Sequence, residues 1–172
     1  MARVFVAVGS NLEPERHVPE GLRRLSARVP LVAISTFYRT EPEGRPEQPA
    51  FYNGVVEVAT DLSPRELKFD VLREIERQTG RVRAADRYAA RTLDLDLLLY
   101  GDQQVQEPDL VLPDPDLARR AFLAAPLAEL APELVVPGDG RTTAQIAAAA
   151  PGRLESLPEF TARLRKEIIH ES

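Results

Sequence analysis

The chain has 172 residues, a formal net charge of −5 and no cysteine. This length suits one domain with its own core, and the lack of cysteine excludes a disulfide framework and thiol chemistry. The negative charge argues against general nucleic-acid binding, and no apolar stretch approaches the roughly 20 residues of a membrane span. Residues 1–9 are too short an apolar run for a signal peptide, so we expect a cytoplasmic protein whose residues 1–172 form a single domain.

The first half of the chain alternates strand and helix patterns. Residues 4–8 predict a buried strand, residues 14–28 a helix with Pro14 near its start, and residues 31–38 a second strand rich in β-forming residues. A proline-rich loop leads to a third strand at residues 55–59. Ser63, Pro64 and Glu66 form an N-terminal capping signal for a helix that we expect to end near residue 79, with Gly80 just beyond it.

The second half predicts a strand at residues 92–100 and short strands near Val105 and at residues 110–112. Helices are expected at residues 116–125, from Pro126 onward, at residues 143–150 and at residues 158–170. The order β-α-β-β-α-β predicts an α+β fold of ferredoxin-like topology, an antiparallel sheet with helices packed on it. Short C-terminal helices follow, and residues 158–172 are expected to be a helical appendage.

The segment of residues 80–91 concentrates positive charge. It holds four arginines against one acid, Asp86, and it lacks a helical or strand period, so we expect a loop that binds an anion. The arginines are Arg81, Arg83, Arg87 and Arg91.

The strand that follows carries two acids on one face. Asp94 and Asp96 are two residues apart and therefore point the same way, with Leu98 and Tyr100 continuing their face and the leucines at 93, 95, 97 and 99 on the other. Two like charges beside a hydrophobic run are costly unless they are compensated, and a hard divalent cation is a natural partner for carboxylates. With the neighbouring arginines, the pattern suggests metal-assisted phosphoryl transfer.

Other interpretations of these residues stay open at this point. The two acids are also compatible with the solvent face of an edge strand, and the arginines with a general anion patch. The sequence has no P-loop, no protein-kinase signature and no His/Cys cluster for zinc, and we expect His17 and His170 at the surface.

The motifs resemble those of the 6-hydroxymethyl-7,8-dihydropterin pyrophosphokinases of folate biosynthesis. The resemblance covers residues 1 to about 146 and is most specific where Gly-Arg-Val-Arg at residues 80–83 precedes Arg-Thr-Leu-Asp-Leu-Asp at residues 91–96. The other matching segments are residues 8–12, 37–40, 48–53, 116–126 and 129–132.

The resemblance implies that the pyrophosphoryl group of ATP passes to the hydroxymethyl oxygen of the pterin, leaving AMP. It implies two Mg²⁺ ions held by Asp94 and Asp96, and catalytic roles for Arg81 and Arg91 beside them. It also implies that loops around residues 9–15, 41–53 and 81–91 close over the substrates and exclude water.

The resemblance also assigns the two substrate sites residue by residue. A flat pterin requires aromatic stacking and an amide at its polar edge. Without the resemblance, the aromatic residues assigned to the sites would suit core packing, the amide a turn and the acid a helix surface. The implied ATP contacts are Glu76, Arg83, Arg87, Tyr88, Leu97 and Arg120, and the implied pterin contacts are Thr40, Pro42, Phe51, Asn53 and Phe122.

The chain departs from the family's pattern at several nucleotide positions. Tyr88 stands where Trp is common, and Asp114 where many members have a phosphate-contacting His, so we expect that contact to be either lost or replaced, with Arg119 as the candidate replacement. Arg73 replaces a common Gln, and Asp109 and Val111 replace polar or basic residues. The competing functions are a non-catalytic ligand-binding module and a different nucleotidyl or phosphoryl transferase. We expect a monomer that binds small molecules, with a dimer as the alternative.

Overall fold

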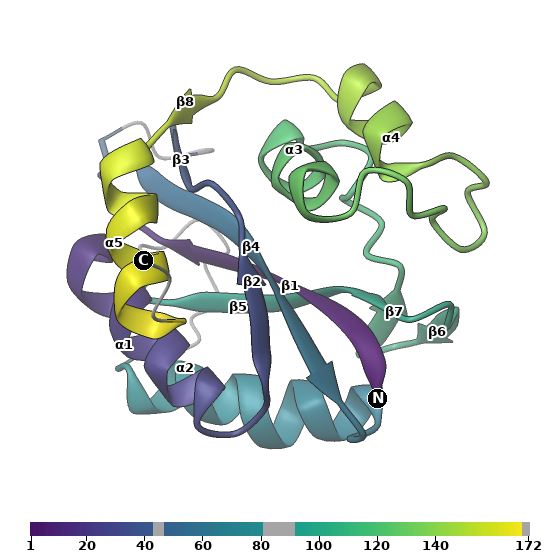
Figure 1. The fold of residues 1–172 in the computed structure, drawn as a ribbon, viewed down its shortest axis with the longest axis horizontal. Coiled ribbons are helices and arrows are strands. Elements are labelled where there is room, and N and C mark those ends of the chain that lie inside the picture. Colours follow the sequence, from purple (N-terminus) through teal and green to yellow (C-terminus); the bar gives the residue numbers. More distant parts are fainter. Residues whose placement is uncertain (43–46, 81–91, 170–172) are drawn as a thin grey trace.

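The computed structural model describes residues 1–42, 47–80 and 92–169. Figure 1 shows the elements. They are β1 (Ala2–Ser10), α1 (Pro14–Ser26), β2 (Leu31–Ile34), β3 (Tyr38–Thr40), β4 (Phe51–Thr60), the π-helix η1 (Glu66–Leu72), α2 (Arg73–Gln78), β5 (Asp94–Tyr100), β6 (Val105–Glu107), β7 (Leu110–Leu112), α3 (Ala121–Leu130), α4 (Thr143–Ala149), β8 (Glu155–Ser156) and α5 (Pro158–Ile168).

The main sheet has the strand order β5-β1-β4-β3-β8, and β2 pairs with β4 along the same edge as β3. Each pairing within the described residues is antiparallel. β6 and β7 form a separate antiparallel hairpin. The predicted α+β class with an antiparallel sheet is therefore confirmed.

The sheet has a hydrophobic core on each face, because successive side chains of a strand point to opposite sides. One core joins alternate residues of β1, such as Val6, to α1, η1 and α5. The other joins Phe5 and Ala7 to α3 and α4. Figure 1 shows the same division, with α1, α2 and α5 on one side of the sheet and α3 and α4 on the other.

The predicted strand at residues 31–38 is interrupted in the structure. β2 ends at Ile34 and β3 begins at Tyr38, which leaves Ser35, Thr36 and Phe37 outside the ladder. The cause is local: the Ser35 hydroxyl accepts a hydrogen bond from the Val55 N–H at 2.8 Å, in the place of a backbone acceptor.

The second predicted helix forms, but its first part is a π-helix. Ser63 and Glu66 exchange the two hydrogen bonds of a capping box, at 2.9 and 3.1 Å, as predicted. Gly80 follows α2 with φ +91°, which confirms it as the left-handed residue beyond the helix. Between them, η1 has the wide turn that is rare in proteins and frequent near functional sites.

Two other predictions are wrong. The expected helices at residues 116–125 and from Pro126 are one helix, α3, with Pro126 inside it, because burial of Leu123, Pro126 and Leu127 outweighs the single helical bond that proline removes. His17 is not at the surface: it is 8 % exposed, and its Nδ1 lies 2.5 Å from the Leu12 carbonyl oxygen, which ties the start of α1 to the preceding loop. His170 lies outside the described residues.

Among the residues that the structure describes, no helix is both long enough and apolar enough to cross a bilayer.

Candidate active site

The paired acids of β5 lie on the sheet face away from α1 and α2. Asp94 is opposite Gly9 of β1, and Asp96 is opposite Ala7. Leu95, between them, is fully buried in the core on the other face. The alternation of the strand therefore sets both carboxylates on one face, one pleat apart.

A β-bulge divides β5 just beyond the acids. Leu97 pairs with Val6 and Leu99 with Phe5, so Leu98 is left without a partner on β1. Leu98 and Leu99 both join the core beneath α3, whereas Tyr100 turns to the core beneath α1. The expectation that Tyr100 shares the face of the acids and Leu99 opposes it is wrong, because the extra residue reverses the alternation.

Two charged side chains hold the outer edge of β5 between the acids. Glu76 is 2 % exposed, and its Oε2 accepts a hydrogen bond from the Leu95 N–H at 2.8 Å. Arg73 Nη1 donates to the Leu95 carbonyl and to Glu76 Oε1, both at 3.1 Å. Together they make the two bonds that a neighbouring strand would otherwise make, and Arg73 Nη2 lies 3.7 Å from Asp96 Oδ1.

The electrostatics at Asp96 favour a cation. Burial, and then the nearby charge of Asp94, raise the pKa of Asp96 to about 7, while Arg73 acts to lower it. The side chain is nevertheless 45 % exposed, because it stands in a cleft that is surrounded by protein yet open to water. Two adjacent carboxylates that solvent can reach are suitable ligands for Mg²⁺, an ion that keeps several water ligands and binds phosphate oxygens. In the described ranges no group of three or more His, Cys, Asp or Glu side chains could hold a metal, so water and substrate would complete the shell.

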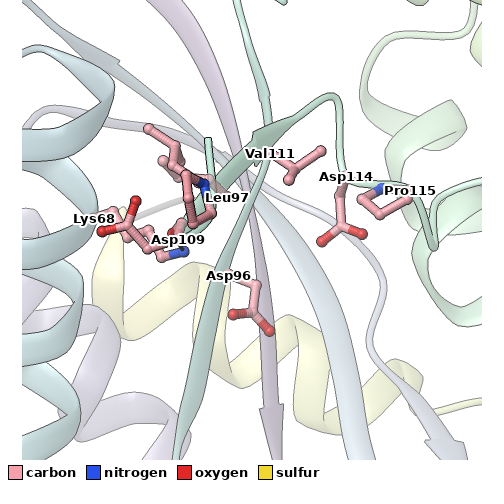
Figure 2. A pocket seen from close by; sticks show the side chains of 9 residues that line it. Lys68, Asp96, Leu97, Asp109, Val111, Asp114 and Pro115 are labelled. Atoms are coloured by element: carbon pink, nitrogen blue, oxygen red, sulfur yellow. Dashed lines mark hydrogen bonds between the residues drawn. The ribbon is translucent and has the colours of Figure 1, made fainter. Parts of the chain in front are cut away.

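The cleft beside Asp96 has a volume of about 340 Å³. Its walls come from β5, η1, the β6–β7 hairpin and the segment after β7, and include Leu97, Leu110, Val111, Asp114 and Pro115. Figure 2 shows Asp96 extending from β5 and Asp114 from the segment after β7. The Asp114 N–H bonds the Leu98 carbonyl at 2.9 Å, which fixes this wall to β5, and burial raises the pKa of Asp114.

Among the described residues that line the cleft, Lys68 carries the positive charge, and its part in the site was not predicted from the sequence. Its ammonium group donates to the Asp109 carbonyl, and both terminal nitrogens of Arg65 donate to the Asp109 carboxylate, at 2.8 and 3.0 Å. Thus η1 and the residue before it hold the hairpin in place. Arg119, the candidate to replace the missing His, is instead exposed, and its Nη1 lies 3.9 Å from Asp116 Oδ1. The available signal was compositional: Lys68 is one of only two lysines in the chain.

The predicted pterin residues gather across the same sheet face. Asp94, Gly9, Asn53 and Tyr38 follow one another in register across β5, β1, β4 and β3. Gly9 leaves room in this row for the Asn53 amide, because a Cβ there would lie only 2.7 Å from Asn53 Oδ1. Asn53 Nδ2 donates to Thr40 Oγ1 at 2.7 Å, which turns Oδ1 toward Gly9.

The remaining predicted residues are not part of this row. Phe51 is half-buried and shares the face of Asn53, two residues along β4, and Pro42 is half-buried after β3. Phe122 is half-buried and packs on the core beneath α3, with Arg120 directly before that helix. Five predicted residues lie outside the described residues, namely Arg81, Arg83, Arg87, Tyr88 and Arg91.

Two of the expected loops are tied together. Asn11 is fully buried, and its Nδ2 donates to Gln48 Oε1 at 3.1 Å and to the Pro49 carbonyl at 3.3 Å. The loop after β1 and the segment before β4 are therefore joined beside the row that contains Gly9 and Asn53.

The sequence profile of the 7,8-dihydro-6-hydroxymethylpterin-pyrophosphokinase (HPPK) family matches residues 5–132. The chain belongs to this family. It is 45 % identical over 161 residues to the 2-amino-4-hydroxy-6-hydroxymethyldihydropteridine pyrophosphokinase of Pseudomonas aeruginosa, covering 91 % of this chain and 97 % of that protein. The enzyme of the same name from Haemophilus influenzae is 41 % identical over 140 residues, covering 80 % and 86 %.

The crystal structure of Plasmodium falciparum HPPK-DHPS with SDX-DHP is similar in fold, with a TM-score of 0.62 at 14 % identity. The match covers 99 % of this chain and 45 % of that one. At this identity the similarity concerns the fold alone.

Proposed function

We propose that this HPPK-family protein binds ATP in the cleft beside Asp96 and the pterin over Gly9, and that Asp94 and Asp96 hold the metal ions between them. The chain is a diphosphokinase of folate biosynthesis: it transfers pyrophosphate from ATP to the hydroxymethyl group of 6-hydroxymethyl-7,8-dihydropterin and releases AMP. The observation that carries the site assignment is the row across the sheet, in which Asp94, the first of the paired acids, and the oriented Asn53 amide flank Gly9.

The orientation of the Asn53 amide suggests where the pterin, the acceptor of the reaction, would bind. Because Thr40 accepts from Nδ2, the Oδ1 atom is available over Gly9 to accept a hydrogen bond from the polar edge of a pterin. Phe51 and Phe122 would stack on the ring faces. The pterin would then lie across β1 and β4, beside the two acids of β5, whose strand pairing supports this proposal.

The transfer step itself needs positioning more than covalent help. The hydroxymethyl oxygen forms a bond to the β-phosphorus of ATP, and the bond from that phosphorus to the α–β bridging oxygen breaks. AMP leaves with the bridging oxygen, and the hydroxyl proton passes to solvent. Two Mg²⁺ ions on Asp94 and Asp96 would neutralise charge on the phosphates. Arg81 and Arg91 are proposed to stabilise the transferring group. The residues proposed to bind ATP are Glu76, Arg83, Arg87, Tyr88, Leu97 and Arg120. For Glu76, the position behind β5 favours an indirect role through Leu95 and Arg73.

We also infer a ferredoxin-like topology for the single domain. Counting β2 and β3 as one interrupted strand gives the order fourth, first, third, second, with α1 after the first strand and η1–α2 after the third, which supports this inference. A cytoplasmic location is proposed, since the reaction consumes ATP and a folate precursor, and a monomer is proposed with a dimer as the alternative.

One assay tests the proposal. The purified protein is incubated with ATP, Mg²⁺ and the hydroxymethyl dihydropterin, and the products are separated. We expect AMP and the pterin diphosphate in equal amounts. ADP in place of AMP would indicate another phosphoryl transferase, and nucleotide binding without turnover would indicate a binding module.

A further inference from the structure

The gap between β2 and β3 is filled by the C-terminal part of the chain. The Phe37 N–H donates to Thr161 Oγ1 at 2.8 Å, and the Phe37 carbonyl accepts from the Leu157 N–H at 2.8 Å. The Ile34 carbonyl accepts from Arg165 Nε at 3.0 Å. Together with Glu129 of α3, which accepts from the Thr36 N–H at 2.9 Å, residues of and just before α5 therefore supply the partners that the interrupted strand lacks.

The Phe37 side chain is fixed from two sides. It is fully buried and meets Phe160 of α5 edge-on, with ring centroids 5.7 Å apart, and Phe160 meets Tyr52 of β4 in the same way at 5.0 Å. On the other side it lies against the backbone of Gly54, where a Cβ would be 2.5 Å from the ring. Gly54 directly follows Asn53 in β4, so the anchored ring adjoins the proposed pterin contact.

β3 begins at the residue after Phe37 and has only three residues. It pairs with β4 on one side and with β8 on the other, where Tyr38 is opposite Ser156 and Arg39 opposite Glu155. A strand this short depends on its flanks for position. Its last residue, Thr40, holds the Asn53 amide, so the orientation of that amide depends on where the C-terminal segment sets β3.

We propose that residues 155–168 position the pterin side of the active site, with Thr161 as the positioning residue. Thr161 is 2 % exposed; its hydroxyl accepts from the Phe37 N–H and donates to the Leu157 carbonyl at 2.8 Å, so it joins α5 to the start of β3 without touching the substrate. This segment follows the part of the chain that the family profile matches, which ends at residue 132. The inference rests on the proposed function, because it assumes that the pterin binds beside Asn53.

The test compares Thr161→Val with Thr161→Ser. Valine keeps the shape of threonine but loses both hydrogen bonds, whereas serine keeps the hydroxyl. We expect the KM for the pterin at saturating MgATP to rise about fivefold to thirtyfold in Thr161→Val, the range that the loss of one or two buried hydrogen bonds corresponds to. The Kd for a non-hydrolysable ATP analogue should stay within about twofold, and Thr161→Ser should restore the parental KM.

Thr143→Val is the matched control. Thr143 is also a buried helical threonine, and its hydroxyl bonds the Ala131 carbonyl in the α3–α4 region. Its loss should lower the melting temperature in a similar way and leave the pterin KM unchanged. Phe160→Leu serves if Thr161→Val does not fold, because it keeps an apolar residue and loses the edge contacts to Phe37 and Tyr52.

The outcomes separate two failures. If the parental protein neither binds the pterin nor forms AMP, the proposed function is wrong. If the parental protein is active, and the foldable variant of α5 is less stable but has an unchanged pterin KM, α5 is only structural and the inference is overturned. An equal rise in the KM for the pterin and in the Kd for the ATP analogue would overturn the inference too.

Discussion

The carboxylate of Glu76 accepts a hydrogen bond from the backbone N–H of Leu95 at 2.8 Å, behind the strand residue that separates the two acids. This carboxyl group is tolerated at 2 % exposure because Arg73 and the edge of β5 form hydrogen bonds with it. The relationship explains how one strand at the edge of a sheet keeps Asp94 and Asp96 in a fixed geometry.

Glu76→Ala should destabilise the protein strongly. The change leaves Arg73 half-buried without its carboxylate and the Leu95 N–H without an acceptor, which is expected to cost about 3–5 kcal/mol of unfolding free energy. Urea denaturation measures it. Glu74→Ala is the control on the same helix, where an exposed ion pair with Arg77 is lost; an equal loss of stability in the control would contradict the role assigned to Glu76.

Asp96→Asn should remove activity and keep the fold. An amide matches the carboxylate in shape but is a poor ligand for Mg²⁺, so we expect turnover to fall by roughly a thousandfold or more. The coupled AMP assay gives the rate, and circular dichroism reports the fold. Residual activity within tenfold of the parent would count heavily against a metal-binding role.

The contribution of Asp96 to the stability of the metal-free protein should fall as the pH rises from about 4 to about 7. The unfolded carboxyl ionises near 3.9, whereas in the folded protein Asp96 has a pKa of about 7, so in this range the folded state binds more protons. Melting curves in a chelator measure the slope. Because other groups titrate as well, the comparison is with Asp96→Asn, in which this part of the slope should disappear.

Gly9→Ala should weaken pterin binding. The added methyl group would lie 2.7 Å from Asn53 Oδ1, so the Asn53 amide must turn away from β1. We expect the KM for the pterin to rise by roughly tenfold or more, which corresponds to about 1.4 kcal/mol, with little change in nucleotide affinity. Steady-state kinetics with each substrate varied in turn checks this, and an unchanged pterin KM would place the pterin elsewhere.

Arg91→Ala should slow the transfer step by a large factor with less effect on substrate binding, as expected for a cation that acts where charge develops. Single-turnover kinetics separates the two effects. A rise in KM alone would make Arg91 a binding residue.

The sequence predicted the features that depend on local chemistry. The capping box of Ser63 and Glu66 and the single face shared by Asp94 and Asp96 both follow from residue type and spacing. Phe51, Asn53 and Thr40 were assigned together only through the family resemblance, and the strand pairing brings them together in space.

The features that were missed depend on distant contacts. The bulge at Leu98 arises from its register with β1, and the continuity of α3 through Pro126 from the core that it covers. The position of His17 is the exception, because its ring bonds the carbonyl of Leu12, only five residues earlier. Lys68 lines the cleft because η1 and the β6–β7 hairpin meet there, and no period in the sequence indicates that meeting.

The bulge at Leu98 has a consequence for how β5 can change over evolution. Before it, the strand presents carboxylates to a solvent-accessible cleft, and after it the strand closes two apolar interiors. Deleting one residue there would turn Leu99 and Tyr100 to the wrong sides, even though every remaining amino acid was unchanged. Changes in the length of β5 are thus restricted as strictly as changes in its amino acids.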